Sequence, residues 1–309
     1  MKLIKFLTSL IISILVTNQS YGIENKIILK IGNEIITSYD IQKEANYLSS
    51  LNPNIKNLSN DQIYTLSKNS LIRYKIKQNE ILKNFDNYEV DRDVIDQFIE
   101  NIINKNNLNS KKEFFNHIKK NKLSIDYIEK KISMEVLWNR LIYIKYYSKV
   151  KTDNKKIKEQ IKKNNKLGKK QVFLQEILFE IKENENINSK YKILKKSIDE
   201  EGFEKTALLY SLSETSKNSG NIGWVDANSL NKNILKEVNK LNIGESTNPI
   251  TIPGGFLILK LKNTRIEREE INIEEEIKKI VQNKINEQLN QYSLIYYNKI
   301  KKNININEL

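Results

Sequence analysis

The chain has 309 residues, and 52 Lys or Arg against 38 Asp or Glu give it a formal net charge of +14. It contains no Cys and one His, which excludes disulfides, thiol catalysis and Cys-based metal sites and leaves little basis for His-based chemistry. We therefore expect no cofactor. The lysines are spread along helical patterns and no nucleic-acid-binding motif accompanies them, so we expect no nucleic-acid partner. No phosphate-binding loop is present to support ATP-driven work.

The first 22 residues have the pattern of a secretory signal peptide. Lys2 and Lys5 precede an apolar run over 6–16, and the segment ends in small residues at Gly22. The run is shorter than the ~20 residues that cross a bilayer, so we expect no stable membrane insertion after cleavage. The mature protein is expected outside the cytoplasm.

Residues 23–150 predict a helical module that begins with a short hairpin. Two alternating segments over 27–37 flank a Gly32-Asn33 turn, and Thr37 or Ser38 then caps a helix beginning at Asp40. Apolar residues at helical spacing follow over 60–85, 91–104, 110–118 and 124–144. Four or five such helices can bury one another. His117 lies on one of them without a partner His or Cys, so we assign it a packing or surface role.

Residues 151–170 are rich in lysine and have only Ile157 and Ile161 as regular apolar positions. This pattern predicts an exposed linker helix.

Residues 171–265 predict a small antiparallel sheet surrounded by helices. An alternating strand over 171–181 opens the region, and a Pro/Gly turn leads into a second strand over 248–261. Between them we expect two short helices, and then a glycine turn, a loop and a third helix over 219–245.

Residues 266–309 carry a long helical pattern with apolar residues at three- and four-residue steps. A stripe of that length needs burial, since apolar surface is worth ~25 cal/mol per Å². We therefore expect it to fold back onto the N-terminal helices, with residues 303–309 adding a strand to the first hairpin. The predicted fold is α+β, with residues 171–265 inserted into one helical module.

The glycines and prolines of this inserted region match a family pattern with almost no gaps. The matching residues are Gly220, Gly223, Trp224, Leu241, Gly244, Glu245, Pro249 and Gly255. The region resembles the parvulin-type (PpiC, rotamase) peptidyl-prolyl isomerase domain. The opening hairpin, the helix that follows it and the order of the later helices resemble SurA-type periplasmic chaperones.

The resemblance implies two histidines that face each other across the substrate cleft. Glu176 and Leu257 occupy those positions here, the family's hydroxyl falls on Ile252, and its catalytic Cys or Asp falls near Ser213 or Glu214. The apolar pocket for a proline ring is implied to persist, formed by Ile222, Leu230 and Ile234 with Phe256 beside them. Alternatively, these residues and Leu257 belong to the core of the domain. For Ile222 and Leu257 the core and the pocket interpretations are about equally supported.

Two functions follow as hypotheses. The first is an ATP-independent periplasmic chaperone, expected to be monomeric, that holds unfolded outer-membrane or other exported polypeptides and has weak or no isomerase activity. The alternative is an active prolyl isomerase with an altered site. A third hypothesis is a basic protein that binds anionic surfaces or nucleic acid, and the signal peptide argues against a nucleic-acid partner.

Overall fold

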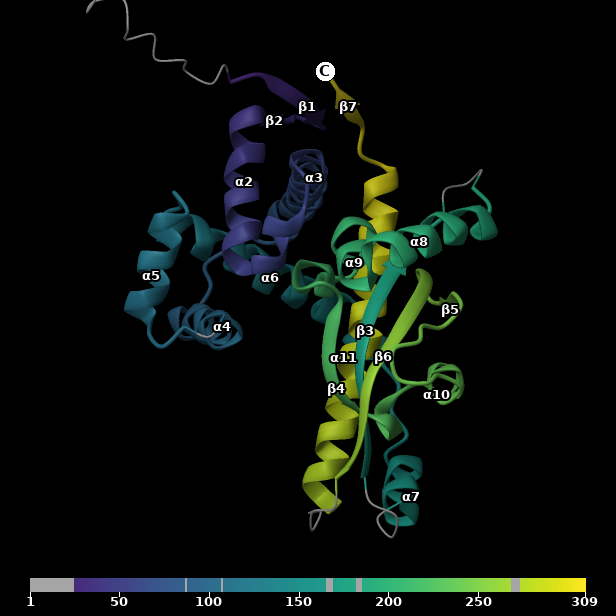
Figure 1. Cartoon of the computed structure of the whole chain (residues 1–309). Helices are drawn as coiled ribbons and strands as arrows, with labels where there is room; N and C mark the ends of the chain where they lie inside the picture. The colour runs from purple at the N-terminus through teal and green to yellow at the C-terminus, as the bar shows by residue number, and fades with distance from the viewer. Residues whose placement is uncertain (1–24, 87, 107, 165–168, 182–184, 268–272) are drawn as a thin grey trace, which may run out of the picture.

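The structure, a computed structural model, describes residues 25–86, 88–106, 108–164, 169–181, 185–267 and 273–309 (Figure 1). The segment interpreted as a signal peptide lies outside these ranges. The fold is α+β, as predicted, with two small antiparallel sheets among the helices. None of the helices in the described ranges has the length and apolar character needed to span a membrane.

The two ends of the described chain meet in one sheet. Strands β1 (Ile27–Ile31) and β2 (Glu34–Thr37) form the predicted hairpin. The C-terminal strand β7 (Ile306–Glu308) pairs antiparallel with β1, so the strand order is β2-β1-β7. Figure 1 shows β7 beside β1 at one end of the molecule. The predicted extra strand is therefore present.

Five helices follow the hairpin, each preceded by a polar capping residue. They are α2 (Ser38–Leu51), α3 (Asn60–Asn84), α4 (Arg92–Lys105), α5 (Lys111–Lys120) and α6 (Ile125–Tyr146). Thr37 caps α2 in a capping box, because its hydroxyl accepts from the Asp40 N–H and the Asp40 carboxylate accepts from the Thr37 N–H. These caps satisfy backbone donors that the first turn of a helix leaves free.

A buried ion pair joins three of these helices. Lys131 of α6 lies 2.6 Å from the Glu44 carboxylate of α2, and Glu44 is fully buried. The hydroxyls of Ser70 and Tyr127 also donate to Glu44, at 2.6 and 2.9 Å. Burial lowers the pKa of Lys131, and Glu44 acts in the opposite direction. A charged pair in this position is tolerable because two hydroxyls donate to the carboxylate in addition to the lysine.

The C-terminal helix α11 (Ile273–Lys302) packs back onto α3 and α6, as predicted. The indole N–H of Trp138 donates to the Ser293 hydroxyl at 2.8 Å. Tyr146 of α6 stacks on Tyr292 of α11 with ring centroids 4.8 Å apart. In Figure 1 α11 runs along the inserted sheet and continues past α3 toward β7. The helix therefore contacts both parts of the molecule.

Helix α7 (Asn154–Asn164) is exposed over 154–159 except at Ile157, as its composition predicts, but it also packs on α11, which its composition does not predict. Ile157 is buried against Ile280, and Ile277 and Val281 of α11 pack beside it. One apolar residue of α7 is sufficient for this packing because the first turns of α11 present an apolar stripe to it.

The inserted region forms a four-stranded antiparallel sheet in the order β4-β3-β6-β5. Its strands are β3 (Lys169–Phe179), β4 (Asn221–Asp226), β5 (Ile250–Ile252) and β6 (Gly255–Glu267). Helices α8 (Ile187–Glu201) and α9 (Phe203–Tyr210) cover one face, and α10 (Lys232–Val238) packs on the other.

The glycine turn expected at the start of residues 219–245 is present at Ser219 and Gly220, but strand β4 lies where a loop was expected. This strand pairs with β3, and Trp224 packs edge-on against Phe173 with ring centroids 5.4 Å apart. Gly223 has φ +90 within the strand, a conformation that favours glycine. Gly220 directly before the strand and Gly223 within it make the sequence look like a loop, because the strand owes its pairing to the long neighbour β3.

Candidate functional site: a cavity between the inserted sheet and the C-terminal helix

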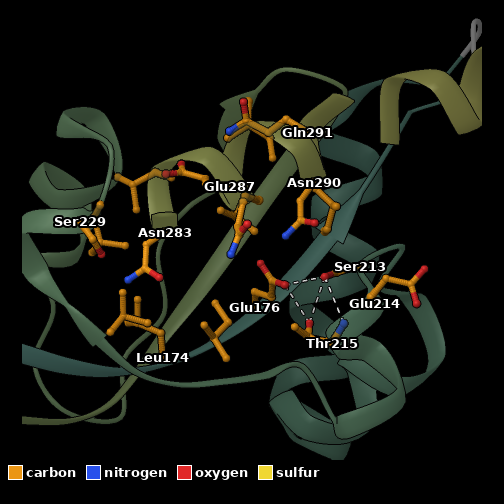
Figure 2. A pocket seen from close by; sticks show the side chains of 18 of the residues that line it. Leu174, Glu176, Ser213, Glu214, Thr215, Ser229, Asn283, Glu287, Asn290 and Gln291 are labelled. Atoms are coloured by element: carbon orange, nitrogen blue, oxygen red, sulfur yellow. Dashed lines mark hydrogen bonds between the residues drawn. The ribbon is translucent and has the colours of Figure 1, made fainter. Parts of the chain in front are cut away.

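A cavity of about 480 Å³ lies between one face of the inserted sheet and α11 (Figure 2). The sheet and the segments around it supply an apolar wall of Leu174, Leu178, Ile222, Leu230, Ile234, Ile252, Leu257 and Leu259. The helix supplies polar side chains, among them Asn283, Asn286, Glu287, Asn290 and Gln291. Mostly apolar walls with a few polar groups are typical of binding sites.

Glu176 of β3 is one of the polar groups that line the cavity from the sheet. Its Oε1 accepts hydrogen bonds from the Ser213 hydroxyl at 2.5 Å and the Thr215 hydroxyl at 2.8 Å (Figure 2). Its backbone N–H donates to the Gly220 carbonyl at 2.8 Å. These contacts fix the carboxylate at the position where the family pattern places its first histidine.

Burial raises the pKa of Glu176, and the hydrogen bonds from Ser213 and Thr215 act in the opposite direction. A carboxyl whose folded pKa is raised binds its proton more tightly in the folded state than in the unfolded state. Its contribution to stability is therefore greatest at low pH and is lost as the pH rises through the folded pKa.

We predict that Glu176→Gln stabilises the protein at neutral pH and that its advantage shrinks as the pH falls. The amide oxygen can still accept from both hydroxyls, but it carries no charge to desolvate. Chemical denaturation of both proteins between pH 4 and 8 measures the difference in the free energy of unfolding. A difference that stays constant across this range would contradict the raised pKa.

Glu214 follows Ser213 but takes part in a different cluster. It accepts from Lys77 of α3 at 2.7 Å, and Lys77 also bonds Glu135 of α6 at 2.9 Å. Lys217 bridges Glu135 at 3.3 Å and Glu214 at 3.0 Å. The Asn52 amide adds a bond to the Lys217 carbonyl at 2.9 Å. The turn that holds Glu176 is thus docked on the helical module.

The structure brings most of the predicted site residues together. Ile222, Leu230 and Ile234 line the cavity, together with Leu257. Leu257 and Glu176 lie on neighbouring strands, since Glu176 pairs with Leu259, two residues further along the same face. The two positions that carry histidines in the family therefore do share this cavity.

Phe256 is the exception and needs correction. It lies on the opposite face of the sheet, where its ring stacks on Phe179 with centroids 5.6 Å apart in the cluster covered by α8 and α9. Successive residues of a strand point to opposite faces, so Phe256 cannot face the cavity when Leu257 does.

The polar wall from α11 is the part of the site that sequence reasoning missed. The apolar stripe of residues 273–302 predicts one buried face of the helix. The polar residues between the apolar positions were not predicted to line a site. Those at 283, 287 and 290–291 recur at helical spacing and share one face. That periodicity was the available signal.

Outside the cavity, the single histidine has a packing role. The His117 Nε2–H donates to the Ser50 carbonyl at 2.9 Å, which ties α5 to α2. Among the residues that the structure describes, no group of three or more His, Asp or Glu side chains is arranged to hold a metal ion.

The order of strands and helices around this cavity defines a parvulin-like domain. Residues 176–263 match the family model described as the PPIC-type PPIASE domain, or rotamase. The chain therefore contains a rotamase domain of the PpiC type.

The chain is also similar to a chaperone of known sequence and to solved structures. The chaperone SurA of Pseudomonas putida is 37% identical over 75 residues, which cover 24% of this chain and 17% of that chaperone. A solved structure described as a SurA-like chaperone of Campylobacter jejuni is 15% identical, with a TM-score of 0.36, over 92% of this chain and 99% of its own. The peptidylprolyl isomerase PrsA of Bacillus anthracis is 21% identical, with a TM-score of 0.32, over 77% and 97%. The predicted resemblance to parvulin-type isomerases and to SurA is confirmed by the family model and the SurA match.

Proposed function

We propose that the protein is a chaperone that holds extended, apolar segments of unfolded polypeptides in this cavity and has weak or no isomerase activity. The observation that carries the proposal is the apolar wall, which includes Ile222 at 39% exposure. A large apolar side chain left open beside a cavity is available to a ligand.

The chemistry of the site favours holding over isomerisation. Rotation about an X–Pro bond has a barrier of ~18–20 kcal/mol, and a catalyst must bind the twisted amide more tightly than the planar one. Polar groups aimed at the twisted amide supply that preference. Leu257 offers none, and one of the two carboxylate oxygens of Glu176, Oε1, already accepts from both Ser213 and Thr215.

The finer proposal concerns compartment, clients and organisation. The signal-peptide pattern and the similarity to SurA support a periplasmic, ATP-independent, monomeric chaperone for unfolded outer-membrane or other exported proteins. We divide the chain into a helical module over 23–150, a linker helix over 151–170, a parvulin-like domain over 171–265 and a C-terminal helix over 266–309 that closes the module.

Ile222→Asp tests the proposal, because it places a charge on the apolar wall at an exposed position that the fold tolerates. We expect the Kd for the peptide acetyl-Gly-Ala-Leu-Pro-Phe-Gly-amide to rise at least tenfold, since burying an unpaired charge costs more than ~1.4 kcal/mol. Peptide binding is followed by the change in fluorescence of Trp224, which lines the cavity. The buried Trp138 contributes a constant background.

Ile243→Asp is the matched control. Ile243 belongs to the same domain and is 61% exposed, but it does not line the cavity. If the two variants bind the peptide equally well, the cavity is not the binding site and the proposal fails.

The alternative function, an active isomerase, has one observation in its favour. Glu176, Ser213 and Thr215 form a connected polar group beside the apolar pocket. Exchange spectroscopy of the same peptide by NMR measures cis/trans interconversion directly. An acceleration by the protein that Glu176→Gln removes would favour the enzyme over the chaperone.

A further inference from the structure

The walls of the cavity differ in chemistry: the sheet side is mainly apolar, whereas α11 contributes a set of polar side chains beside Ile280, Leu294 and Tyr297. Glu287, Asn290 and Gln291 of α11 line the cavity across from Leu174 and Glu176 of the sheet (Figure 2). The side chains of Asn283, Asn290 and Gln291 make no hydrogen bond to any residue that the structure describes. Each amide therefore keeps a free carbonyl and a free NH₂ group for a ligand.

A polypeptide in an extended conformation needs such partners. Its backbone carries an N–H and a C=O at every non-proline residue, and a buried backbone group without a partner is costly. Its side chains alternate between two sides, so one side can face an apolar wall. A wall of leucines and isoleucines alone would leave the backbone groups unpaired.

The spacing along α11 also fits an extended chain. Side chains four residues apart on a helix are separated by roughly 6 Å along its axis. Equivalent groups of an extended chain recur every two residues, about 6.6 Å apart. Asn283, Glu287 and Gln291 form a row with this spacing, and its length of roughly 12 Å corresponds to about four extended residues.

Glu287 fits the same row. Burial raises the pKa of its carboxyl, and Lys284 acts in the opposite direction. A carboxyl that gains a proton presents one donor and one acceptor, as an amide does.

We propose that the polar row of α11, formed by Asn283, Glu287, Asn290 and Gln291, binds the backbone of an extended polypeptide segment whose apolar side chains pack on the sheet. The proposal rests on the function proposed above and assigns the C-terminal helix a direct part in it. Recognition of the backbone is independent of sequence, so the row would allow clients of many sequences, while the apolar wall selects exposed hydrophobic segments.

The double variant Asn283→Ala/Asn290→Ala tests the row. Both positions are exposed on a helix and alanine favours helix, so the variant is expected to fold. We expect its Kd for acetyl-Gly-Ala-Leu-Pro-Phe-Gly-amide to rise about 25-fold, since each of the two hydrogen bonds that are lost changes a Kd by roughly fivefold. Lys278→Ala changes an exposed position of α11 that does not line the cavity, and it should bind as the unaltered protein does.

A second probe separates backbone contacts from side-chain contacts. In a set of depsipeptides, each non-proline amide of the peptide is replaced in turn by an ester, which removes one N–H and keeps every side chain. At least one ester should weaken binding to the unaltered protein by roughly fivefold. The loss should shrink toward none in the double variant.

The outcomes distinguish this inference from the proposed function. Equal binding by the double variant and the unaltered protein, or an equal ester effect in both, overturns the role of α11. If Ile222→Asp weakens binding in that case, the cavity still holds the peptide through the sheet alone. If Ile222→Asp also binds normally, the proposed function itself fails.

Discussion

Replacing Lys131 by methionine is expected to lower the free energy of unfolding by about 3–5 kcal/mol. Lys131 is the cation beside Glu44, and Glu44 has no exposed surface. Methionine fills the space of the lysine stem, so the main loss is the charge that compensates the carboxylate. Ser70 and Tyr127 still donate to Glu44, but neutral hydroxyls do not balance a full charge. Chemical denaturation followed by circular dichroism measures the change.

The double variant Lys131→Met/Glu44→Gln is the control for this explanation. The glutamine carbonyl can accept from the Ser70 hydroxyl, and its NH₂ group can donate to the Tyr127 hydroxyl, without a buried charge. The double variant should therefore regain most of the lost stability. If it is as unstable as the single variant, the cost comes from packing around position 131 and the electrostatic explanation is wrong.

Trp138→Ala is expected to cost a similar amount, about 3–5 kcal/mol, because it opens a large cavity in the core. Trp138 is 1% exposed, bonds Ser293 and stacks on Tyr296 with ring centroids 5.9 Å apart. Both partners belong to α11, so the substitution should also loosen that helix. Faster amide hydrogen exchange along α11, together with the lower stability, is the expected result.

Tyr143→Ala is the matched control on α6. Its ring is 47% exposed and stacks on Tyr147, which does not belong to α11. Its effect should stay within about 0.5 kcal/mol. Exchange in α11 that is unchanged by Trp138→Ala would contradict the view that this helix completes the N-terminal module.

The elements with long sequence patterns were predicted correctly. The helical stripe of residues 266–309 predicts a helix that packs on the N-terminal helices, and α11 packs on α3 and α6. The alternating residues of β3 predict a strand, whereas the short β4, with Gly223 inside it, does not. The packing of α7 on α11 was not predicted because the apolar partner of Ile157, Ile280, lies 123 residues further along the chain.

The site was predictable only on the side that the family pattern describes. Ile222, Leu230 and Ile234 were identified by their matched positions, and they line the cavity. Phe256 was wrongly predicted to line the cavity. It alternates with Leu257 along β6 and therefore points to the opposite face of the sheet. The polar wall of the cavity forms because α11 crosses the sheet on the side that bears Leu174 and Leu257. No local sequence pattern predicts this tertiary arrangement.

Suppression of aggregation of an unfolded outer-membrane β-barrel protein tests the central claim most directly, with the unaltered protein, Ile222→Asp and Ile243→Asp compared at equal concentration. The account predicts that the unaltered protein and Ile243→Asp suppress aggregation to the same extent and that Ile222→Asp suppresses it far less. Equal suppression by all three would show that the cavity between the sheet and α11 does not hold the client.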